Sequence, residues 1–174
     1  MEYDRNLLSR IEQAETLEFH GAAWRVTYLG FPPSRANILG ARWNPKDVGA
    51  LYLSTTLECA LAEFDYRHRA QPIPPPLDWQ SHEFRVDLTR VVDFSNMTQL
   101  KKLGLEVERA PEGLAGYGPF QSIGGGAALL HFEAMIVPSL RFKGLNIVVF
   151  TANVEAGTAS ALSLVASRPA IPPS

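Results

Sequence analysis

The stretch from Gly40 to Arg69 constrains the fold most, because its hydrophobic period changes from that of a strand to that of a helix without a loop between them. Within Ala50–Ser54, Leu51 and Leu53 point to one side and Tyr52 to the other, as in a short strand. The helix that follows is expected to bury four residues at helical spacing: Leu57, Ala60, Leu61 and Phe64.

Polar residues on this strand–helix unit come close together. Thr55 is expected to cap the helix, and Glu58 three residues later completes a capping box. Glu63 lies about 110° from the centre of the apolar stripe at ~100° per residue, at the boundary between core and solvent. A carboxylate at such a boundary can face a cleft, and the polar loop Arg42–Gly49 enters the strand from the same region.

The remaining strands are short and separated by turn residues, which predicts one α+β domain. Glu83–Leu88 alternates cleanly between apolar and charged residues, as a half-buried strand does. Further strands are expected over Phe19–Leu29 with a break near Gly21, and over three apolar runs: Val91–Phe94, Ala134–Val137 and Asn146–Phe150. On Phe19–Leu29, we expect one face to carry Trp24, Val26 and Tyr28.

Helices are expected at three other places. Asp4 can cap a helix over Asp4–Ala14, and Ser95 or Asn96 can cap one over Thr98–Leu103 that ends at Gly104. Gln121–His131 can also be helical, although Gly124–Gly126 lower its helix propensity. That glycine run lacks the Lys-Ser/Thr of a phosphate-binding loop.

Loops and a tail complete the prediction. Glycine and proline indicate loops over Gly30–Leu39, Gln71–Leu77 and Glu106–Phe120. We assign residues 1–154 to the domain and residues 155–174 to an Ala/Ser/Pro-rich, loosely packed tail with one turn of helix near Leu162.

The composition excludes several classes of function. The 174 residues are 46% hydrophobic and 20% charged, which is typical of a soluble globular domain. A net charge of -2 without a basic stripe argues against direct nucleic-acid binding. One cysteine fits a reducing cytoplasm, and the polar N-terminus predicts no secretory signal and no membrane span. Four scattered histidines with one cysteine predict no metal site.

Taken one by one, the polar candidates also have ordinary structural explanations. Glu63 and Arg67 have the spacing of a surface ion pair on a helix. Arg42 is equally consistent with an unremarkable loop arginine, and Tyr52 with a rim aromatic. Ser139 after Pro138 can cap a turn, and Arg25 can lie on the solvated face of its strand: the spacing alone does not decide.

Taken together, they resemble the RES family, which is named for an arginine, a glutamate and a serine. The resemblance covers roughly Glu18–Val154. It rests on six motifs: Trp24-Arg25-Val26, Gly40-Ala41-Arg42-Trp43-Asn44-Pro45, Gly49-Ala50-Leu51-Tyr52-Leu53-Ser54, Ala60-Leu61-Ala62-Glu63-Phe64, Ile136-Val137-Pro138-Ser139-Leu140-Arg141 and Asn146-Ile147-Val148-Val149-Phe150.

The resemblance implies a compact fold similar to that of ADP-ribosyltransferases, with a small, twisted, mostly antiparallel sheet flanked by short helices. It implies a toxin of a bacterial toxin–antitoxin pair that cleaves the nicotinamide–ribose bond of NAD+ by phosphorolysis or hydrolysis. Some such proteins instead transfer ADP-ribose to a protein target. NAD+ is then substrate rather than cofactor, inorganic phosphate is a possible co-substrate, and the partner is a cognate Xre-type antitoxin or immunity protein.

The site residues follow by position in these motifs. The resemblance identifies Arg42, Glu63 and Ser139 as the family arginine, glutamate and serine, Tyr52 as the motif tyrosine, and Arg25 as an earlier arginine near the site. Glu63, Arg42 and Tyr52 are the implied catalytic residues. Binding of NAD+ is implied for Arg25, Arg42, Tyr52 and Ser139.

Overall fold

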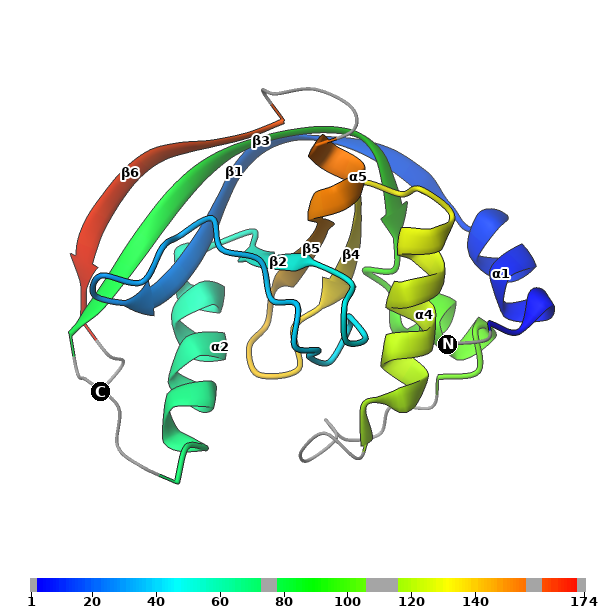
Figure 1. The fold of residues 1–174 in the computed structure, drawn as a ribbon, viewed down its shortest axis with the longest axis horizontal. Helices are drawn as coiled ribbons and strands as arrows, with labels where there is room; N and C mark the ends of the chain where they lie inside the picture. Colours follow the sequence, from blue (N-terminus) through cyan, green and yellow to red (C-terminus); the bar gives the residue numbers. More distant parts are fainter. Residues whose placement is uncertain (1–2, 73–77, 106–115, 156–160, 172–174) are drawn as a thin grey trace.

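A long antiparallel ribbon arches over the molecule (Figure 1). In the computed structural model, β1 (Thr16–Tyr28) pairs antiparallel with β3 (Trp79–Asp93), and β6 (Leu162–Ala170) pairs antiparallel with β3 as well. The apolar residues of the predicted alternation in β3 are buried, so that prediction is confirmed. The structure describes residues 3–72, 78–105, 116–155 and 161–171.

Three short strands form the second half of the sheet: β2 (Ala50–Ser54), β4 (Ala134–Pro138) and β5 (Leu145–Phe150). β5 pairs antiparallel with both β2 and β4. The two halves join where β4 runs parallel to Val91–Asp93 of β3, and where Trp24 of β1 pairs with Ser54 of β2. The sheet therefore closes on itself, with β6 added beside β3. This confirms the α+β class and the mostly antiparallel core.

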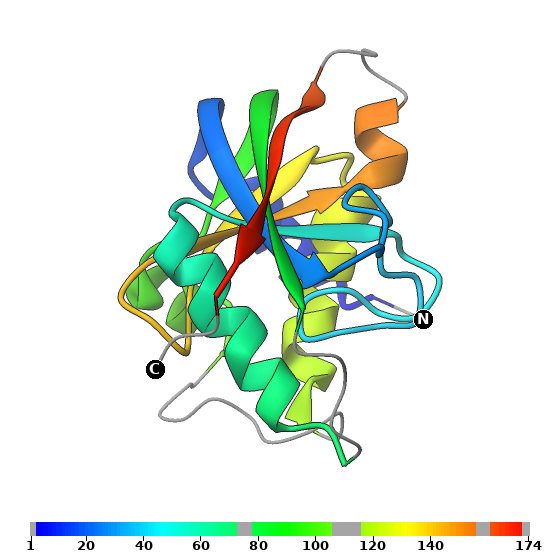
Figure 2. The ribbon, with the colours of Figure 1, turned by 90° about the vertical axis from the view of Figure 1, so that its left-hand side faces the viewer.

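Helices α1, α2 and α4 lie at two ends of this sheet, and α5 lies between them under the arch (Figures 1 and 2). α2 lies beneath the β1–β3–β6 ribbon, whereas α1 and α4 lie side by side at the other end. The bounds are Arg5–Glu12 for α1, Leu57–Arg69 for α2, Met97–Lys102 for α3, Gly118–Leu129 for α4 and Thr151–Glu155 for α5. The predicted caps Asp4 and Asn96 each accept a backbone hydrogen bond at 2.8 Å.

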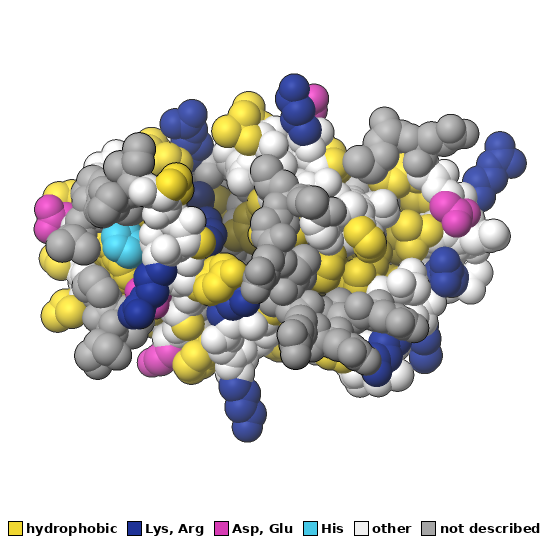
Figure 3. Space-filling model, turned by 90° about the horizontal axis from the view of Figure 1, so that it is seen from below, with side chains coloured by type: hydrophobic (Ala, Val, Ile, Leu, Met, Phe, Trp, Pro, Cys, Tyr) yellow, Lys and Arg dark blue, Asp and Glu magenta, His cyan; other side chains and the backbone are white. Residues whose placement is uncertain are grey.

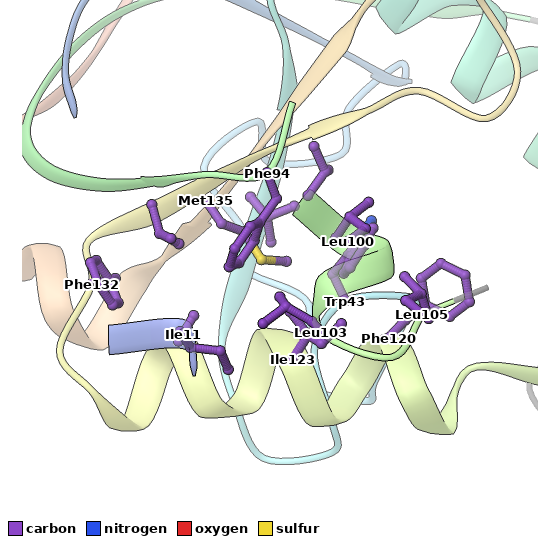
Figure 4. Close-up of a cluster of buried hydrophobic side chains, with 14 of the residues drawn as sticks. Ile11, Trp43, Phe94, Leu100, Leu103, Leu105, Phe120, Ile123, Phe132 and Met135 are labelled. Carbon is purple, nitrogen blue, oxygen red and sulfur yellow. The ribbon is translucent and has the colours of Figure 1, made fainter. Parts of the chain in front are cut away.

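Separate hydrophobic clusters hold the two ends. The larger one packs β4 and β5 against α1, α3 and α4, and Figure 4 shows Phe120 and Ile123 of α4 directed toward Trp43 and Leu103. Under α2, the ring of Phe64 makes edge-to-face contacts with Tyr28 and Trp79, both with centroids 4.9 Å apart. The expected face of Trp24, Val26 and Tyr28 packs here, against α2.

The glycine run lies inside α4 because other elements need the space that side chains would occupy. A Cβ on Gly124 would lie 1.7 Å from the carbonyl oxygen of Trp43, and one on Gly126 would lie 2.8 Å from Ile11 Cδ1. Three glycines cost about 1 kcal/mol each in helix propensity. Tertiary packing on both sides of α4 offsets that cost, which the propensity of the segment alone does not indicate.

Two sequence-based expectations about strands are wrong. β1 passes through Gly21 without a break, and its irregularity falls between Leu17 and Phe19. The segment around Leu162, expected as a loosely packed tail with one turn of helix, is strand β6. Its backbone groups are satisfied by the edge of β3, a partner that is distant in the sequence and therefore invisible to local propensity.

The cap of α2 is also shifted by one residue. Thr56 is the N-cap, and its hydroxyl accepts a hydrogen bond from the Cys59 amide at 3.2 Å. The amide of Thr55 instead donates to the Leu145 carbonyl at 3.0 Å, which continues the pairing of β2 with β5. The tertiary pairing therefore decides which of two adjacent threonines caps the helix.

Three expected segments lie partly outside the described residues. These are residues 73–77 of the loop Gln71–Leu77, residues 106–115 of the loop Glu106–Phe120, and residues 156–160 and 172–174 of the tail. Among the residues that are described, no helix has both the length and the apolar character needed to cross a membrane.

Candidate functional site

A cleft of about 730 Å³ lies between α2, the strands β1 and β2, and the loop that precedes β2. Four of the five residues singled out in the sequence line it: Arg25, Arg42, Tyr52 and Glu63. Seen from below, the surface is hollowed beside α2, and hydrophobic and Lys/Arg side chains border the hollow (Figure 3). Arg42 and Glu63, which are 21 positions apart in the sequence, therefore face a shared cavity.

The carboxylate of Glu63 is held by two donors. Ser139 Oγ donates to Glu63 Oε1 at 2.7 Å, and Asn146 Nδ2 donates to the same oxygen at 2.9 Å. Hydrogen bonds to a charged acceptor are stronger than neutral ones and fix its orientation. Both of these bonds end on Oε1, so the orientation of the carboxyl group, and with it Oε2, is set.

Asn146 is a site residue that the sequence reasoning missed. The sequence predicts Asn146 only as the start of an apolar strand. In the structure its side chain is 7% exposed, and its Oδ1 accepts a hydrogen bond from Ser54 Oγ at 2.8 Å. Because Ser54 fixes the amide oxygen, the amide nitrogen is directed at Glu63. The available signal was a polar residue at the start of a continuous apolar run, where a buried amide needs partners.

Ser139 caps a turn and also contacts Glu63. Its hydroxyl oxygen accepts hydrogen bonds from the amides of Arg141 and Phe142, both at 3.1 Å, which is the turn cap. The hydroxyl proton is thereby left for Glu63. The structure thus places Ser139 in contact with the carboxylate, and it reaches the cleft through Glu63.

Tyr52 organises the loop that carries Arg42. Its hydroxyl donates to Asn44 Oδ1 at 2.7 Å and accepts from the Trp43 amide at 3.0 Å. Asn44 is fully buried, and its amide group donates to the carbonyls of Asn37 and Val48 at 3.0 and 2.8 Å. Burial raises the pKa of Tyr52, so its hydroxyl stays neutral and its ring forms part of the cleft wall.

Helix α4 supports the same loop from the side opposite the cleft. Gln121 Nε2 donates to the Ala41 carbonyl at 2.9 Å, and the rings of Trp43 and Phe120 meet edge to face with centroids 5.0 Å apart. The close approach at Gly124 completes this contact. Arg42 therefore projects from a backbone fixed on both sides of its own position.

Arg25 is used in part to hold a loop. Its Nη1 donates to the carbonyls of Pro33 and Arg35 at 2.6 and 3.0 Å. Burial, with a smaller contribution from the positive charge of Arg67, lowers the pKa of Arg25 to about 10. One arm of the guanidinium is thus committed to the segment that forms the outer wall of the cleft.

Positive charge dominates the lining of the cleft. Among the described lining residues, four arginines face a single carboxylate: Arg25, Arg35, Arg42 and Arg67 against Glu63. Guanidinium groups match phosphate oxygens in geometry and charge. No three His, Cys, Asp or Glu side chains in the described part of the chain are grouped so that they could hold a metal ion. The lining is therefore suited to a phosphorylated organic ligand, with one carboxylate placed to stabilise positive charge.

The comparisons with known proteins concern the fold and the family of the chain. The chain is similar to a chain of the crystal structure of the M. tuberculosis MbcT-MbcA toxin-antitoxin complex, with a TM-score of 0.82 and 23% sequence identity over 97% of this chain and 94% of that one. At that identity the likeness shows a shared fold. No curated protein matches the chain. The family model described as the RES domain matches residues 13–169, nearly the whole length, and the protein therefore belongs to the RES-domain family.

Proposed function

We propose that the protein degrades NAD+ by cleaving the bond between nicotinamide and ribose. The observation that carries the proposal is the carboxylate of Glu63, which Ser139 and Asn146 hold at the wall of an arginine-lined cleft. Membership of the RES-domain family supports the proposal.

The chemistry requires little acid catalysis. The nicotinamide ring of NAD+ is cationic, so it leaves as a neutral molecule when the electron pair of the C–N bond moves onto its nitrogen. Positive charge then develops on the ribose, as it does in glycoside cleavage. A preorganised carboxylate stabilises such charge in a site of low dielectric constant. In this proposal Glu63 Oε2 faces the ribose, while Oε1 remains hydrogen-bonded to its two donors.

The acceptor completes the balance of the reaction. In phosphorolysis, an oxygen of inorganic phosphate forms a bond to the anomeric carbon of the ribose and the bond to nicotinamide breaks, which leaves ADP-ribose bearing a new phosphate ester. In hydrolysis, water takes the place of phosphate and releases one proton. The alternative activity is transfer of ADP-ribose to a protein. It uses the same bond cleavage, with a protein side chain as acceptor.

We assign the protein a toxin role, blocked by a cognate antitoxin of the Xre type. The support is family membership together with the fold that it shares with a chain of a toxin-antitoxin complex. Production of the protein alone should arrest bacterial growth, and production of Glu63→Gln should not. Normal growth with the active protein would contradict the toxin role.

The direct test is an assay of nicotinamide release from NAD+, with and without inorganic phosphate. We expect release by the wild type and a loss of at least about 100-fold in Glu63→Gln, because one removed electrostatic contact is worth roughly 10²–10³ in rate. Glu58→Gln is the matched control, since Glu58 is an exposed carboxylate on the same helix. Equal release by the wild type and Glu63→Gln would contradict the proposal. Labelled ADP-ribose on protein in a lysate would favour the alternative acceptor.

A further inference from the structure

The four arginines of the cleft are not equally available to a ligand. Arg25 donates to two backbone carbonyls, and the guanidinium of Arg35 stacks on the ring of Phe31 at 5.6 Å. Both therefore contact the loop that forms the outer wall. Arg67 also stacks on a ring, that of Phe64 at 5.4 Å, but it lies on α2, the helix that carries Glu63. Arg42 and Arg67 are therefore the candidates for holding an anion beside that carboxylate.

Arg67 does not form the helix ion pair that its spacing predicts. It follows Glu63 by four residues, yet no oxygen of Glu63 lies within 4 Å of its guanidinium nitrogens, whereas Arg69 on the same helix binds Asp65 at 2.8 Å. Among the described residues, its contact is with the ring of Phe64, 5.4 Å from the guanidinium carbon. Arg67 also belongs to the described lining of the cleft.

Arg42 has a donor that is left unpaired. Its Nε is buried and has no hydrogen-bond partner among the described residues. A buried donor of this kind is unfavourable when it stays unpaired. The loop around Arg42 is held by Tyr52 and Gln121, so the side chain is presented from a fixed backbone.

The side chains of Arg67 and Arg42 line the same cleft. Burial lowers the pKa of Arg67, the carboxylate of Glu63 raises it, and the positive charge of Arg42 lowers it to a smaller extent. Like charges held near one another in a partly enclosed site are unfavourable. An anion between them would turn this repulsion into two charge-assisted contacts.

We propose that Arg67 and Arg42 together bind one phosphate group, one helical turn from the carboxylate of Glu63. The identity of the ligand rests on the proposed function. The phosphate belongs either to the pyrophosphate of NAD+ or to the inorganic phosphate that acts as acceptor. The sequence predicts Arg67 only as the ion-pair partner of Glu63, and the structure gives it a place in the lining of the cleft.

Binding measurements without turnover test the proposal independently of the reaction. Inorganic pyrophosphate and inorganic phosphate are titrated separately into the wild type and into Arg67→Gln, with Arg69→Gln as the matched control on the same helix. Arg69 is paired with Asp65 and does not belong to the described lining of the cleft. We expect the Kd of at least one probe to rise about 10-fold to 100-fold in Arg67→Gln alone, as expected when a hydrogen bond between charged groups is lost.

Steady-state kinetics of Arg67→Gln then show whether the bound phosphate belongs to NAD+ or is the inorganic phosphate that acts as acceptor. A raised KM for inorganic phosphate, with hydrolysis unchanged, identifies the acceptor site. A raised KM for NAD+ with and without phosphate identifies the pyrophosphate site. Arg67→Lys retains the charge but lacks the planar fork, so we expect an intermediate Kd. Thermal unfolding confirms that each variant is folded.

Two outcomes count against the two proposals separately. If Arg67→Gln binds both probes as tightly as Arg69→Gln does, the phosphate site at Arg67 is excluded. If the wild type binds pyrophosphate through Arg67 but releases no nicotinamide from NAD+, the phosphate site stands and the proposed reaction is wrong.

Discussion

Gly124 of α4 lies directly against the carbonyl oxygen of Trp43, so that a Cβ at this position would be 1.7 Å from the oxygen. Trp43 follows Arg42 in the sequence. The backbone that presents the cleft arginine is therefore positioned by a helix that lies outside the cleft. This contact explains why a glycine occupies a helical position where alanine has the higher propensity.

Gly124→Ala should lower the free energy of unfolding by about 2–3 kcal/mol, since overpacking against backbone outweighs the gain of about 1 kcal/mol in helix propensity. Gly126→Ala makes the same chemical change, but its Cβ would meet the flexible ends of Ile11 and Leu8. We expect that variant to stay within about 1 kcal/mol of the wild type. Denaturant unfolding of both variants compares the two costs, and equal costs would show that the Trp43 contact is not the constraint.

Asn146→Asp should reduce nicotinamide release about 10-fold to 100-fold, because it replaces a donor to Glu63 with a negative charge. Asn153→Asp is the matched control: its amide donates to the carbonyls of Ala128 and Phe132. That control should lower stability while the kcat of the folded protein is retained. Steady-state kinetics beside thermal unfolding separate the two effects, and an unchanged kcat in Asn146→Asp would remove Asn146 from the site.

Tyr52→Phe should cost about 1–3 kcal/mol of stability, because Asn44 Oδ1 and the Trp43 amide both lose their partner. The half-exposed Tyr66 provides the control, since Tyr66→Phe keeps the ring on which Arg141 stacks and should change stability by less than about 0.5 kcal/mol. Denaturant unfolding measures both. A Tyr52→Phe protein as stable as the wild type would show that the hydroxyl does not hold the loop.

Two histidines should give opposite contributions to the pH dependence of stability. Burial lowers the pKa of His82 below 6.5, and its ring is hydrogen-bonded to Thr27 and Ser167, both at 2.8 Å. The contribution of His82 to the free energy of unfolding is therefore present above pH 6.5 and is lost as the pH falls. Hydrogen bonds to Glu18 and Asp87 raise the pKa of His20, so its contribution is present below pH 6.5 and is lost as the pH rises.

The test compares the free energy of unfolding at about pH 7.5 and pH 5.5, on either side of the ordinary histidine pKa. His82→Gln should reduce the amount by which the protein is more stable at the higher pH, and His20→Gln should increase it. Shifts of the same sign in the two variants would contradict the assignment.

The strand–helix unit could be predicted from the sequence because its signals are local. The alternation of Leu51, Tyr52 and Leu53 and the helical spacing of Ala60 and Phe64 depend only on backbone geometry, and both elements form as expected. The motif order likewise identified the cleft residues Arg42 and Glu63. Predictions failed where a distant partner decided the outcome, as in the strand around Leu162.

By itself, the sequence determined the α+β class and the family, and it singled out four residues that line the cleft: Arg25, Arg42, Tyr52 and Glu63. Only the tertiary structure decided how those residues are used: Asn146 and Ser139 hold Glu63, Arg25 holds a loop, and Arg67 lines the cleft without an ion pair. The physical reason is that hydrogen bonds and charge contacts join groups far apart in the chain, and their partners are known only when the strands and helices are packed.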